Sequence, residues 1–528
     1  MSDKLVLKTD ANGKRVRNLI LKSDAYKYTH WRLYPVGTKT VYSYLESRGS
    51  EIPEMDSTMF FGLQIYLKEY LEGVIIEQWM IDEAKIFCKK VFGYDYFNAD
   101  GWQRIVDVHG GRIPLRLRAV PEGTFVPIHN VLMTLENTDE QLPWVTNFFE
   151  TLLFQPDWYG TTACTVSFYI KVLIESYCVK TGEHVNPFHL NDFGYRGVSS
   201  DESAGTGGAA HLVNFSGTDN FSGIEKAMLY YDTDVCGYSV MATEHSVVEM
   251  YKKEFELEAY RHFLDVVPDS AILSSVSDTY DYKNAVENYY CKALHDKIMS
   301  RTGKLVIRPD SGFPPEISVW TLQTLWKYFG GTINEKGFKI VDPHVGIIYG
   351  DGIDYHMIKK ILKAVIDAGF GVSNIIFGMG GALLQKLNRD TFKMAIKASW
   401  GMVEGDGSEG RDIWKETITD VSKASKRGRL RLINNDSGVF TYPYPICDPD
   451  TNKEIPMDED VLVTVFENGV ITKEYTFDEV RANAQKAFED VNKKVSIENP
   501  TFNREKDAAS FAGYAWSESL KEKLKEPL

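Results

Sequence analysis

The sequence predicts an α/β protein: a βα barrel joined to an additional mixed α/β layer domain built from N- and C-terminal segments. Short apolar runs that end in Gly or Asp alternate with helical patterns in the middle of the chain, which is typical of successive βα units. The N-terminal part mixes strand-like and amphipathic segments instead. The 528 residues, with 43% hydrophobic and 25% charged side chains, have a globular composition sufficient for two or three domains.

Residues 1–155 are predicted to form the mixed α/β domain. The strand-like pieces TKTVYSYLES, GGRIPLRLRAV and PEGTFVPI alternate with the amphipathic runs LQIYLKEYLEGV and IDEAKIFCKKVF. Because alternating and helical periodicities occur in turn, strands and helices are both expected here.

Residues 156–400 are predicted to form the barrel, from runs such as VCGYSV, AILSSVSD, KLVIRPDSG, VGIIYGDG and NIIFGMGG. Asp278, Asp310, Asp351 and Gly380 follow one another at intervals of about 32, 41 and 29 residues, close to the length of one βα unit. A βα barrel places its active site at such strand ends. The alternative is that these residues only form turns.

Residues 401–528 contain a Gly-rich polar stretch, a basic loop (KASKRGRLRL) and the pattern VLVTVFENGVITKEYTFDEVRANAQKAF. The last of these has strand and helix periodicity. We expect it to pack back on the N-terminal domain.

Charge and composition exclude several classes of protein. The 59 basic and 74 acidic residues give a net charge of −15, which disfavours nucleic-acid binding through a generally basic surface. Six scattered cysteines favour a reducing compartment. The N-terminus has no apolar signal run, and no stretch approaches a membrane span of about 18 apolar residues. We therefore expect a cytoplasmic protein without a membrane partner.

The segment FGMGGALLQKLNRD predicts a phosphate site. An apolar strand, a Gly-rich turn at Gly380 and Gly381, and a helix carrying Lys386 and Arg389 would present backbone N–H groups and positive charge to an anion. A plain tight turn is the alternative, since neither a Walker A loop nor a dinucleotide fingerprint is present.

Arg308 and Asp310 lie two positions apart at a strand end, so their side chains should share a face. Arg308 can bind phosphate, while the carboxylates of Asp310, Asp278 and Asp351 suit ribose hydroxyls and a Mg²⁺-bound pyrophosphate. An internal salt bridge is the alternative for the Arg308–Asp310 pair.

The segment DFGYRGVSS sets Phe193 and Arg196 around a Gly-rich turn. A protein-kinase interpretation of DFG fails because the other kinase motifs are missing. Core packing remains the alternative for Phe193, and helix capping the alternative for Asp219. Glu244 and His245 start a predicted long helix, where the imidazole is available as an acid, base or nucleophile.

Together these segments resemble the nicotinamide phosphoribosyltransferase family nearly end to end. The resemblance runs through SDAYKYTH, VYSYLESR, AVPEG, NDFGYRGVSS, AHLVNFSGTD, GYSV with EHS, VSDTYD, IRPDSG, GDG, FGMGG with LLQKLNRD, KRGRL and FDEVRANAQ, in the same order and spacing. It implies a homodimeric type II phosphoribosyltransferase whose α/β barrel has its active site completed by the partner subunit, with residues 1–155 contributing to the dimer interface.

The resemblance also implies an activity: nicotinamide and phosphoribosyl pyrophosphate yield nicotinamide mononucleotide and pyrophosphate in NAD salvage, with Mg²⁺ as cofactor. Residue by residue, it assigns the nicotinamide ring to Phe193, Tyr26 of the partner subunit, Asp219 and Ser239; pyrophosphate to Arg196, His245 and Arg308; ribose to Asp310, Gly350 and Asp351; the 5′-phosphate to Gly380, Gly381, Arg389, Arg48 and Lys397; and Mg²⁺ ligation to Asp278 and Asp310. His245, Asp278 and Asp310 would be the catalytic residues.

The family's histidine at position 245 is phosphorylated by ATP, and hydrolysis is coupled to substrate binding. Lys415 and Lys423 match positions near the ATP phosphates. Four positions depart from the family's pattern, which puts channel selectivity and the efficiency of ATP coupling in question: Asn191, Met241, Thr243 and Ala395.

Three alternatives remain open at this point. A nicotinate phosphoribosyltransferase would need a cation for the substrate carboxylate, and Asp219 argues against it because two anions repel. A non-catalytic signalling protein of the same fold is disfavoured by the retained His245, Arg308 and Asp310. An autonomous ATPase would hydrolyse ATP without nicotinamide.

Overall fold

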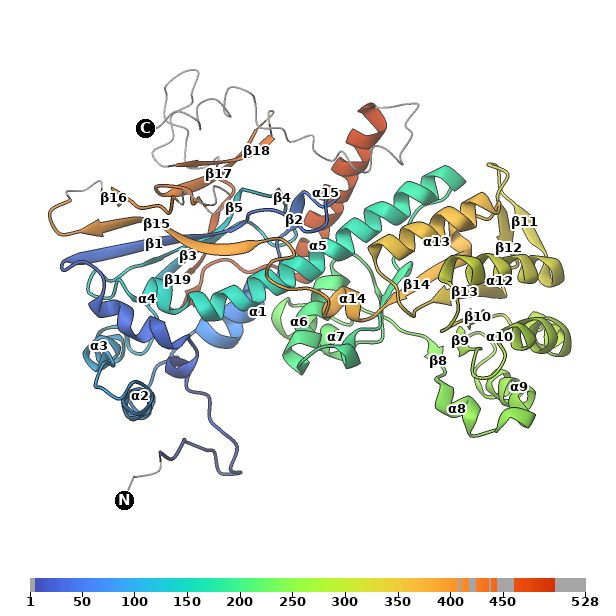
Figure 1. Ribbon diagram of the computed structural model, residues 1–528, viewed down its shortest axis with the longest axis horizontal. Coiled ribbons are helices and arrows are strands. Elements are labelled where there is room, and N and C mark those ends of the chain that lie inside the picture. Colours follow the sequence, from blue (N-terminus) through green and yellow to red (C-terminus); the bar gives the residue numbers. More distant parts are fainter. Residues whose placement is uncertain (1–4, 407–409, 417–423, 436–437, 444–459, 499–528) are drawn as a thin grey trace. The chain divides into compact units, whose positions relative to one another are not determined.

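The protein was studied as a computed structural model that describes residues 5–406, 410–416, 424–435, 438–443 and 460–498. The described residues up to Thr162 and from Asn388 to Asn483 form one compact unit, called unit 1. Those from Ala163 to Leu387 and from Ala484 onward form unit 2. Figure 1 shows the elements of both units in sequence colours.

Unit 2 is built on a parallel half-barrel sheet, so the predicted mixed α/β class is confirmed. Among the described residues its strands lie in the order β7-β6-β14-β13-β10-β9-β8, and every neighbouring pair is parallel. A parallel bridge between Gly217 and Tyr238 links β7 to the segment just before β8. The strands are β6 (Leu190–Asp192), β7 (Gly217–Thr218), β8 (Met241–Ala242), β9 (Leu273–Val276), β10 (Leu305–Arg308), β13 (Val345–Tyr349) and β14 (Ile375–Met379).

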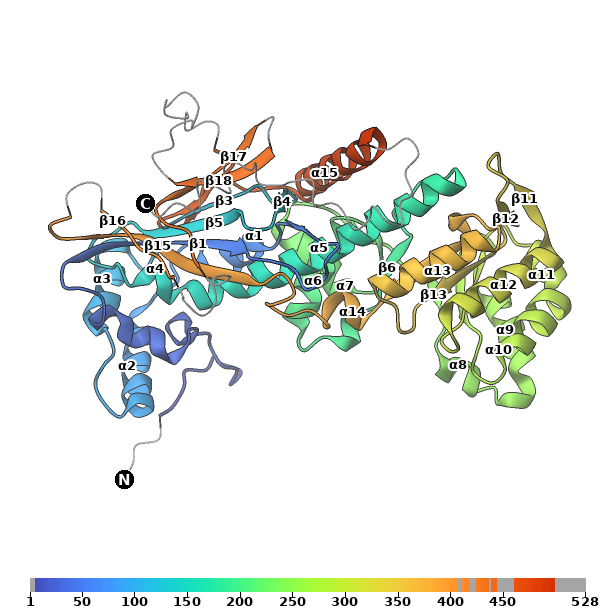
Figure 2. The same cartoon turned by 45° about the horizontal axis from the view of Figure 1, so that its top comes forward.

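The apolar runs become strands because parallel strands are covered on both faces. All five residues of β13 are buried. Helix α13 (Tyr355–Asp367) buries Ile358, Ile361, Leu362 and Val365 along one stripe, as the helical period requires. In Figure 2, α12 (Pro314–Phe329) and α13 run alongside the strands, and α12 packs on both α13 and β13.

One strand of unit 2 lies later in the sequence than predicted. The run VCGYSV is not a strand: β8 begins directly after it, at Met241. The other elements are α6 (Asp201–Leu212), α7 (Phe221–Tyr230), α8 (His245–Glu249), α9 (Glu256–Val266), α10 (Tyr282–Asn284) continued by a π-helix (Ala285–Ala293), α11 (His295–Met299), α14 (Gly381–Leu384), the hairpin of β11 (Gly331–Ile333) with β12 (Lys339–Val341), and 3₁₀ turns at Tyr195–Gly197, Lys253–Phe255 and Val372–Asn374.

Unit 1 is built on an antiparallel sheet of order β16-β15-β1-β5-β3-β19-β20 within the described residues. Strand β19, from near the end of the described chain, pairs with β3 from its first quarter. The strands are β1 (Thr38–Ser47), β3 (Leu115–Ala119), β5 (Val131–Asn137), β15 (Met394–Val403), β16 (Arg411–Asp412), β19 (Val463–Glu467) and β20 (Val470–Ile471).

Helices, 3₁₀ turns and two small two-stranded sheets make up the rest of the described part of unit 1. They are 3₁₀ turns at Leu19–Leu21 and Ala25–Arg32, α1 (Leu63–Tyr66) continued by a π-helix (Leu67–Leu71), α2 (Gln78–Phe92), α3 (Ala99–His109), α4 (Val145–Phe148), the two-stranded sheet of β2 (Ser57–Met59) with β4 (Phe125–Pro127), and the hairpin of β17 (Leu430–Asn435) with β18 (Gly438–Pro443). Helix α15 (Phe477–Glu498) has its residues up to Asn483 in unit 1 and those from Ala484 in unit 2.

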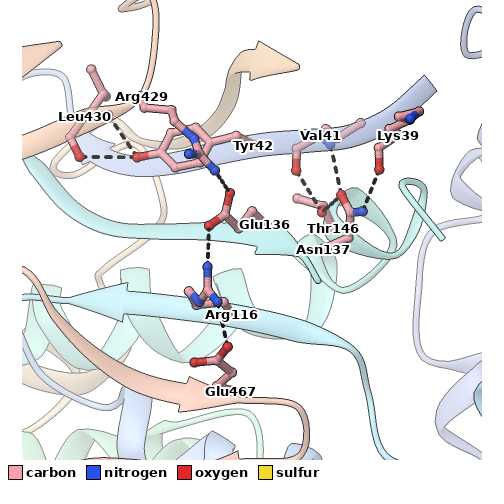
Figure 3. Close-up of polar contacts among 10 residues, drawn as sticks. All are labelled: Lys39, Val41, Tyr42, Arg116, Glu136, Asn137, Thr146, Arg429, Leu430 and Glu467. Carbon is pink, nitrogen blue, oxygen red and sulfur yellow. Dashed lines mark hydrogen bonds and ion pairs between the residues drawn. The ribbon is translucent and has the colours of Figure 1, made fainter. Parts of the chain in front are cut away.

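Charged side chains on the unit 1 sheet pair with one another from strand to strand (Figure 3). Glu136 on β5 accepts from Arg429 and, at 3.2 Å, from Arg116 on β3. Arg116 also donates to Glu467 on β19 at 2.6 Å. Each of these four side chains therefore has a partner of opposite charge. Such pairing is how a protein tolerates charges that are partly withdrawn from water.

Helix α5 (Glu150–Thr181) corrects one expectation from the sequence. Among the described residues it is the one helix long and apolar enough to cross a membrane by length and composition alone. A search of the sequence for an uninterrupted apolar run does not find this helix, because Thr, Ser and Tyr are interspersed with its apolar residues. Of its most apolar window, 83% is buried within the chain, as in the core helix of a globular protein.

Candidate active site

Three ionisable side chains meet at the carboxyl ends of neighbouring parallel strands. His245 starts α8 just after β8, Asp278 follows β9, and Asp310 follows β10. The Nε2 atom of His245 lies 3.8 Å from Oδ1 of Asp278 and 3.6 Å from Oδ2 of Asp310. Because β8, β9 and β10 are adjacent in the sheet, residues about 30 apart in sequence form one cluster.

The cluster holds more negative charge than its neighbours compensate. Burial raises the pKa of Asp310, the Arg308 guanidinium lowers it, and Asp278 and Asp351 raise it further. The Oδ1 atom of Asp278 is buried and has no hydrogen-bond partner among the described residues. Such an arrangement favours binding of a proton or a cation.

The same three residues fit the geometry of a metal site. One ligand atom from each of His245, Asp278 and Asp310 lies within 4.8 Å of the others. Mg²⁺ prefers oxygen ligands, so the two carboxylates suit it better than the imidazole. The Nδ1 atom of His245 is 3.1 Å from the Thr279 hydroxyl, which leaves Nε2 facing the carboxylates.

Arg308 adds positive charge at the end of β10. Its side chain is mostly buried, and its Nε atom lies 3.4 Å from Oδ1 of Asp310. The internal ion pair considered from the sequence is thus present. Its presence leaves anion binding open, because a guanidinium has five N–H donors and Nε makes no hydrogen bond to any residue that the structure describes.

Phe193 lies over the ends of β13 and β14. A Cβ atom on Gly378 would come within 2.1 Å of the Phe193 ring, and one on Gly350 within 3.2 Å. The Phe193 N–H donates to the carbonyl of Met379 at 3.0 Å, which fixes the turn. Gly378 was not identified as a site residue from the sequence, although a glycine inside a strand often marks the close approach of another group.

Asp219 and Ser239 form a polar pair at the end of β7. The Ser239 hydroxyl donates to Oδ1 of Asp219 at 2.5 Å, and both residues are exposed. Arg196 is also exposed, in the 3₁₀ turn at Tyr195–Gly197. Asp219 itself is tied to β6, since its N–H donates to the carbonyl of Asp192 at 3.0 Å.

Two helices at the site are shorter than the sequence predicts. Helix α14 ends at Leu384, so Lys386 and Arg389 are not on it, and Gly380 and Gly381 precede a single turn of four residues. The helix that begins at His245 ends at Glu249. The periodicity of each segment continues beyond these points, so local pattern alone does not set where these helices end.

The basic residues predicted to assist the 5′-phosphate lie in unit 1. Burial lowers the pKa of Lys397, and the nearby charges of Arg48, Lys415 and Arg389 lower it further, against the opposing effect of Glu150. Positions distant in sequence are therefore grouped into one positive cluster. Tyr26 is 56% exposed in the 3₁₀ turn at Ala25–Arg32, and Lys423 lies outside the described residues.

The four departures from the family's pattern occupy structural positions. Asn191 donates to the carbonyls of Phe188 and Phe377 at 3.0 and 3.2 Å. The Thr243 hydroxyl accepts from the Val276 N–H at 2.9 Å, which ties the β8 end to β9. Met241 is exposed on β8, and Ala395 is buried on β15.

Profiles and relatives agree on one family. The nicotinate phosphoribosyltransferase (NAPRTase) family profile matches residues 188–470, and the profile of the nicotinamide phosphoribosyltransferase N-terminal domain matches residues 18–117. Proteins named nicotinamide phosphoribosyltransferase from Xanthomonas campestris and Acinetobacter baylyi are 43% and 34% identical over 474 and 509 residues; each alignment covers 89% of this chain and 98% of the relative.

Solved structures show the fold. Nicotinate-nucleotide pyrophosphorylase from Pyrococcus furiosus matches with a TM-score of 0.57 at 17% identity, covering 93% of this chain and 99% of that one. Human nicotinic acid phosphoribosyltransferase matches with a TM-score of 0.54 at 14% identity, covering 89% of this chain and 94% of that one.

Proposed function

The chain belongs to the nicotinamide phosphoribosyltransferase family, and we propose that it makes nicotinamide mononucleotide and pyrophosphate from nicotinamide and phosphoribosyl pyrophosphate in NAD salvage. The observation that carries the proposal is the convergence of His245, Asp278, Arg308 and Asp310 at one end of the parallel sheet. An aromatic ring and an acidic residue, Phe193 and Asp219, lie at the ends of strands in the same sheet.

The chemistry requires charge stabilisation more than a strong nucleophile. The bond from ribose C1 to the pyrophosphate oxygen breaks with its electron pair on oxygen, and the lone pair of the pyridine nitrogen forms the new bond to C1. As in glycoside cleavage, C1 becomes oxocarbenium-like. Asp310 and Asp351 would hold the ribose and oppose its positive charge, while Arg308, Arg196 and His245 would bind the leaving group.

Asp278 and Asp310 would hold Mg²⁺, which supplies positive charge to the departing pyrophosphate. The buried Oδ1 atom of Asp278, which no described residue hydrogen-bonds, supports this assignment. Arg308 would bind the same pyrophosphate as the Mg²⁺ ion, since its Nε atom lies 3.4 Å from Oδ1 of Asp310.

The ring pocket favours a neutral pyridine. Phe193 would stack on the ring, with Ser239 and Asp219 taking the carboxamide, whose NH₂ group can donate to the Asp219 carboxylate. Nicotinate would instead bring a second anion to the Asp219 carboxylate, and the two negative charges would repel each other. This is why nicotinate phosphoribosyltransferase stays the alternative rather than the proposal.

The finer architecture we propose is a closed βα barrel of the type II phosphoribosyltransferase kind, in a cytoplasmic homodimer with shared active sites. The parallel bridge from Gly217 to Tyr238 supports closure of the sheet. Tyr26 of the partner subunit would cover the second face of the nicotinamide ring. Gly380 and Gly381 would receive the 5′-phosphate, with Arg389, Arg48 and Lys397 assisting across the dimer interface.

The first test is mononucleotide formation by the purified protein with phosphoribosyl pyrophosphate and Mg²⁺, comparing nicotinamide with nicotinate, each with and without ATP. We expect product from nicotinamide, raised by ATP. Preference for nicotinate would overturn the role given to Asp219. ATP hydrolysis at full rate without nicotinamide would favour the autonomous ATPase, and no product from either base would favour a non-catalytic protein.

ATP coupling through His245 has a separate test. Nε2 of His245 would accept the γ-phosphoryl group, with Lys415 and Lys423 near the ATP phosphates. We expect His245→Ala to lose ATP stimulation while it keeps slow ATP-independent transfer. Full stimulation in that variant would overturn the phosphohistidine.

A shared site can be tested by mixing two inactive variants. Neither Tyr26→Ala nor Phe193→Ala should form an intact ring site in its own homodimer. A heterodimer of the two would contain one site with both wild-type rings, so activity should recover on mixing. Failure to recover in confirmed heterodimers would argue against sharing.

A further inference from the structure

A buried carboxylate joins the two turns that carry Phe193 and Asp219. Asp192 ends β6 and is 0% exposed. One of its carboxylate oxygens accepts from the Gly194 N–H at 2.7 Å, immediately after Phe193. The other accepts from Nδ2 of Asn220, immediately after Asp219, at 2.9 Å.

The backbone of Asp192 makes a third connection. Its carbonyl accepts from the Asp219 N–H at 3.0 Å, so carboxylate and carbonyl together hold the residues on both sides of the second turn. The Phe193 turn also has little space to adjust, since a Cβ atom on Gly194 would come within 2.8 Å of Leu384 and 3.0 Å of Asp192.

Asn220 is itself held rigidly. Its Nδ2 atom also donates to the carbonyl of Ala204 on α6 at 2.9 Å, and its Oδ1 atom accepts from the Gly223 N–H at the start of α7. Gly208 on α6 leaves room for it, because a Cβ atom there would lie 2.5 Å from Nδ2. Asp192 is thus connected to two helices as well as two turns.

We propose that Asp192 is a positioning residue for nicotinamide, which sets the spacing and orientation of the Phe193 ring relative to the Asp219 carboxylate. The inference rests on the function proposed above. Asp192 touches no substrate in this scheme and acts through its neighbours. The carboxamide of a ring stacked on Phe193 must reach Asp219 in a single orientation. This requires that the two turns be held at a constant separation.

The position is chemically demanding. Burial raises the pKa of Asp192 to about 6; the hydrogen bonds from Asn220 and Gly194 oppose the shift, and the charge of Asp219 adds to it. A carboxylate at this site is thus stabilised by its two donors. An amide cannot replace it fully, because an Asn side chain would turn its NH₂ group toward one of the two donors.

The test is steady-state kinetics of Asp192→Asn in the full-length enzyme. We expect the KM for nicotinamide to rise about tenfold, the effect of losing a charge-assisted hydrogen bond, while kcat and the KM for phosphoribosyl pyrophosphate change little. The matched control is Asp201→Asn, which makes the same chemical change at an exposed carboxylate that contacts Tyr195 and Ser222.

A side-chain exchange provides the rescue. In the double variant Asp192→Asn with Asn220→Asp, Nδ2 at position 192 can donate to the new carboxylate while Oδ1 still accepts from Gly194. The bond to Ala204 is lost. We expect the exchange to recover most of the KM change, which a loss of general stability would not predict. If Asp192→Asn does not fold, Asn220→Ser provides a second variant. It removes the Nδ2 donor to the Asp192 carboxylate, keeps a helix-capping residue, and should raise the KM for nicotinamide in the same way.

The outcomes separate the two proposals. An inactive wild-type enzyme would overturn the proposed function. An active wild type with an unchanged nicotinamide KM in folded Asp192→Asn, or a change in kcat and both KM values that the exchange does not reverse, would overturn the positioning role alone.

Discussion

Two groups of charged side chains, one in each unit, are organised in opposite ways. In unit 1, Glu136 lies between Arg429 and Arg116, and Arg116 also donates to Glu467. Each of these four charged side chains therefore has an opposite partner (Figure 3). In unit 2, Asp278 and Asp310 lie close together at a sheet end, and Oδ1 of Asp278 has no hydrogen-bond partner in the described part of the chain.

The difference teaches how to separate a structural charge from a functional one. Paired charges across a sheet reduce the cost of desolvation and hold strands in register. Like charges concentrated at strand ends are destabilising by themselves, and a ligand or cation is what compensates them. Substitutions in the two regions should therefore affect different measurements.

Arg308→Ala should have the largest effect, because it removes the cation from the unit 2 cluster. We expect kcat/KM to fall at least about 100-fold with phosphoribosyl pyrophosphate, as for other groups that stabilise developing charge. Arg308→Lys should recover part of the activity. A folded Arg308→Ala enzyme with nearly normal kcat/KM would mean that the guanidinium serves only its ion pair with Asp310.

Gly378→Ala should come next, because the new Cβ atom would lie 2.1 Å from the Phe193 ring and must displace it. We expect the KM for nicotinamide to rise about tenfold or more, consistent with the loss of a well-placed aromatic contact. Gly346→Ala on β13 is the control, since its Cβ atom would be 3.5 Å from the nearest atom, on Lys304. Equal kinetics for the two variants would remove Phe193 from the ring site.

Glu136→Gln should affect stability instead of catalysis. It leaves Arg116 and Arg429 without their shared anion, and we expect the free energy of unfolding to fall by about 1–2 kcal/mol at unchanged kcat/KM. Glu140→Gln, at an exposed pair with Lys39, should change stability much less. Urea unfolding measures both, and a loss of activity in Glu136→Gln would contradict the division between the two groups of charges.

The smallest effect should be seen at acid pH, at Asp139 in unit 1. Burial alone would raise its pKa, but hydrogen bonds from Arg104, His109 and the Gln141 N–H lower it below the usual value. A carboxyl group with a lowered folded pKa stabilises the fold above the unfolded pKa of about 3.9 and loses that contribution as pH falls through the folded value. The difference in free energy of unfolding between wild type and Asp139→Asn should shrink below about pH 4. A constant difference would show that Asp139 is not linked to acid unfolding.

Local pattern was sufficient for much of the unit 2 sheet. Runs such as KLVIRPDSG and VGIIYGDG predicted β10 and β13, because a strand covered on both faces is apolar throughout and ends at a polar turn. The same pattern identified Asp278 and Asp310 as residues at strand ends. Local pattern failed for helix length: α8 and α14 are single turns, although the periodicity of both segments continues.

The sequence by itself determined the residue types of the site and the alternation of strands and helices, because these depend on side-chain chemistry and on short-range periodicity. The tertiary structure alone decided which distant residues meet. It paired Glu136 with Arg429, gathered Arg48, Arg389 and Lys397 into one positive cluster, and buried Asp192 between two turns. The physical reason is that strand order and register are set by the burial of whole faces, and that information is spread over the entire chain.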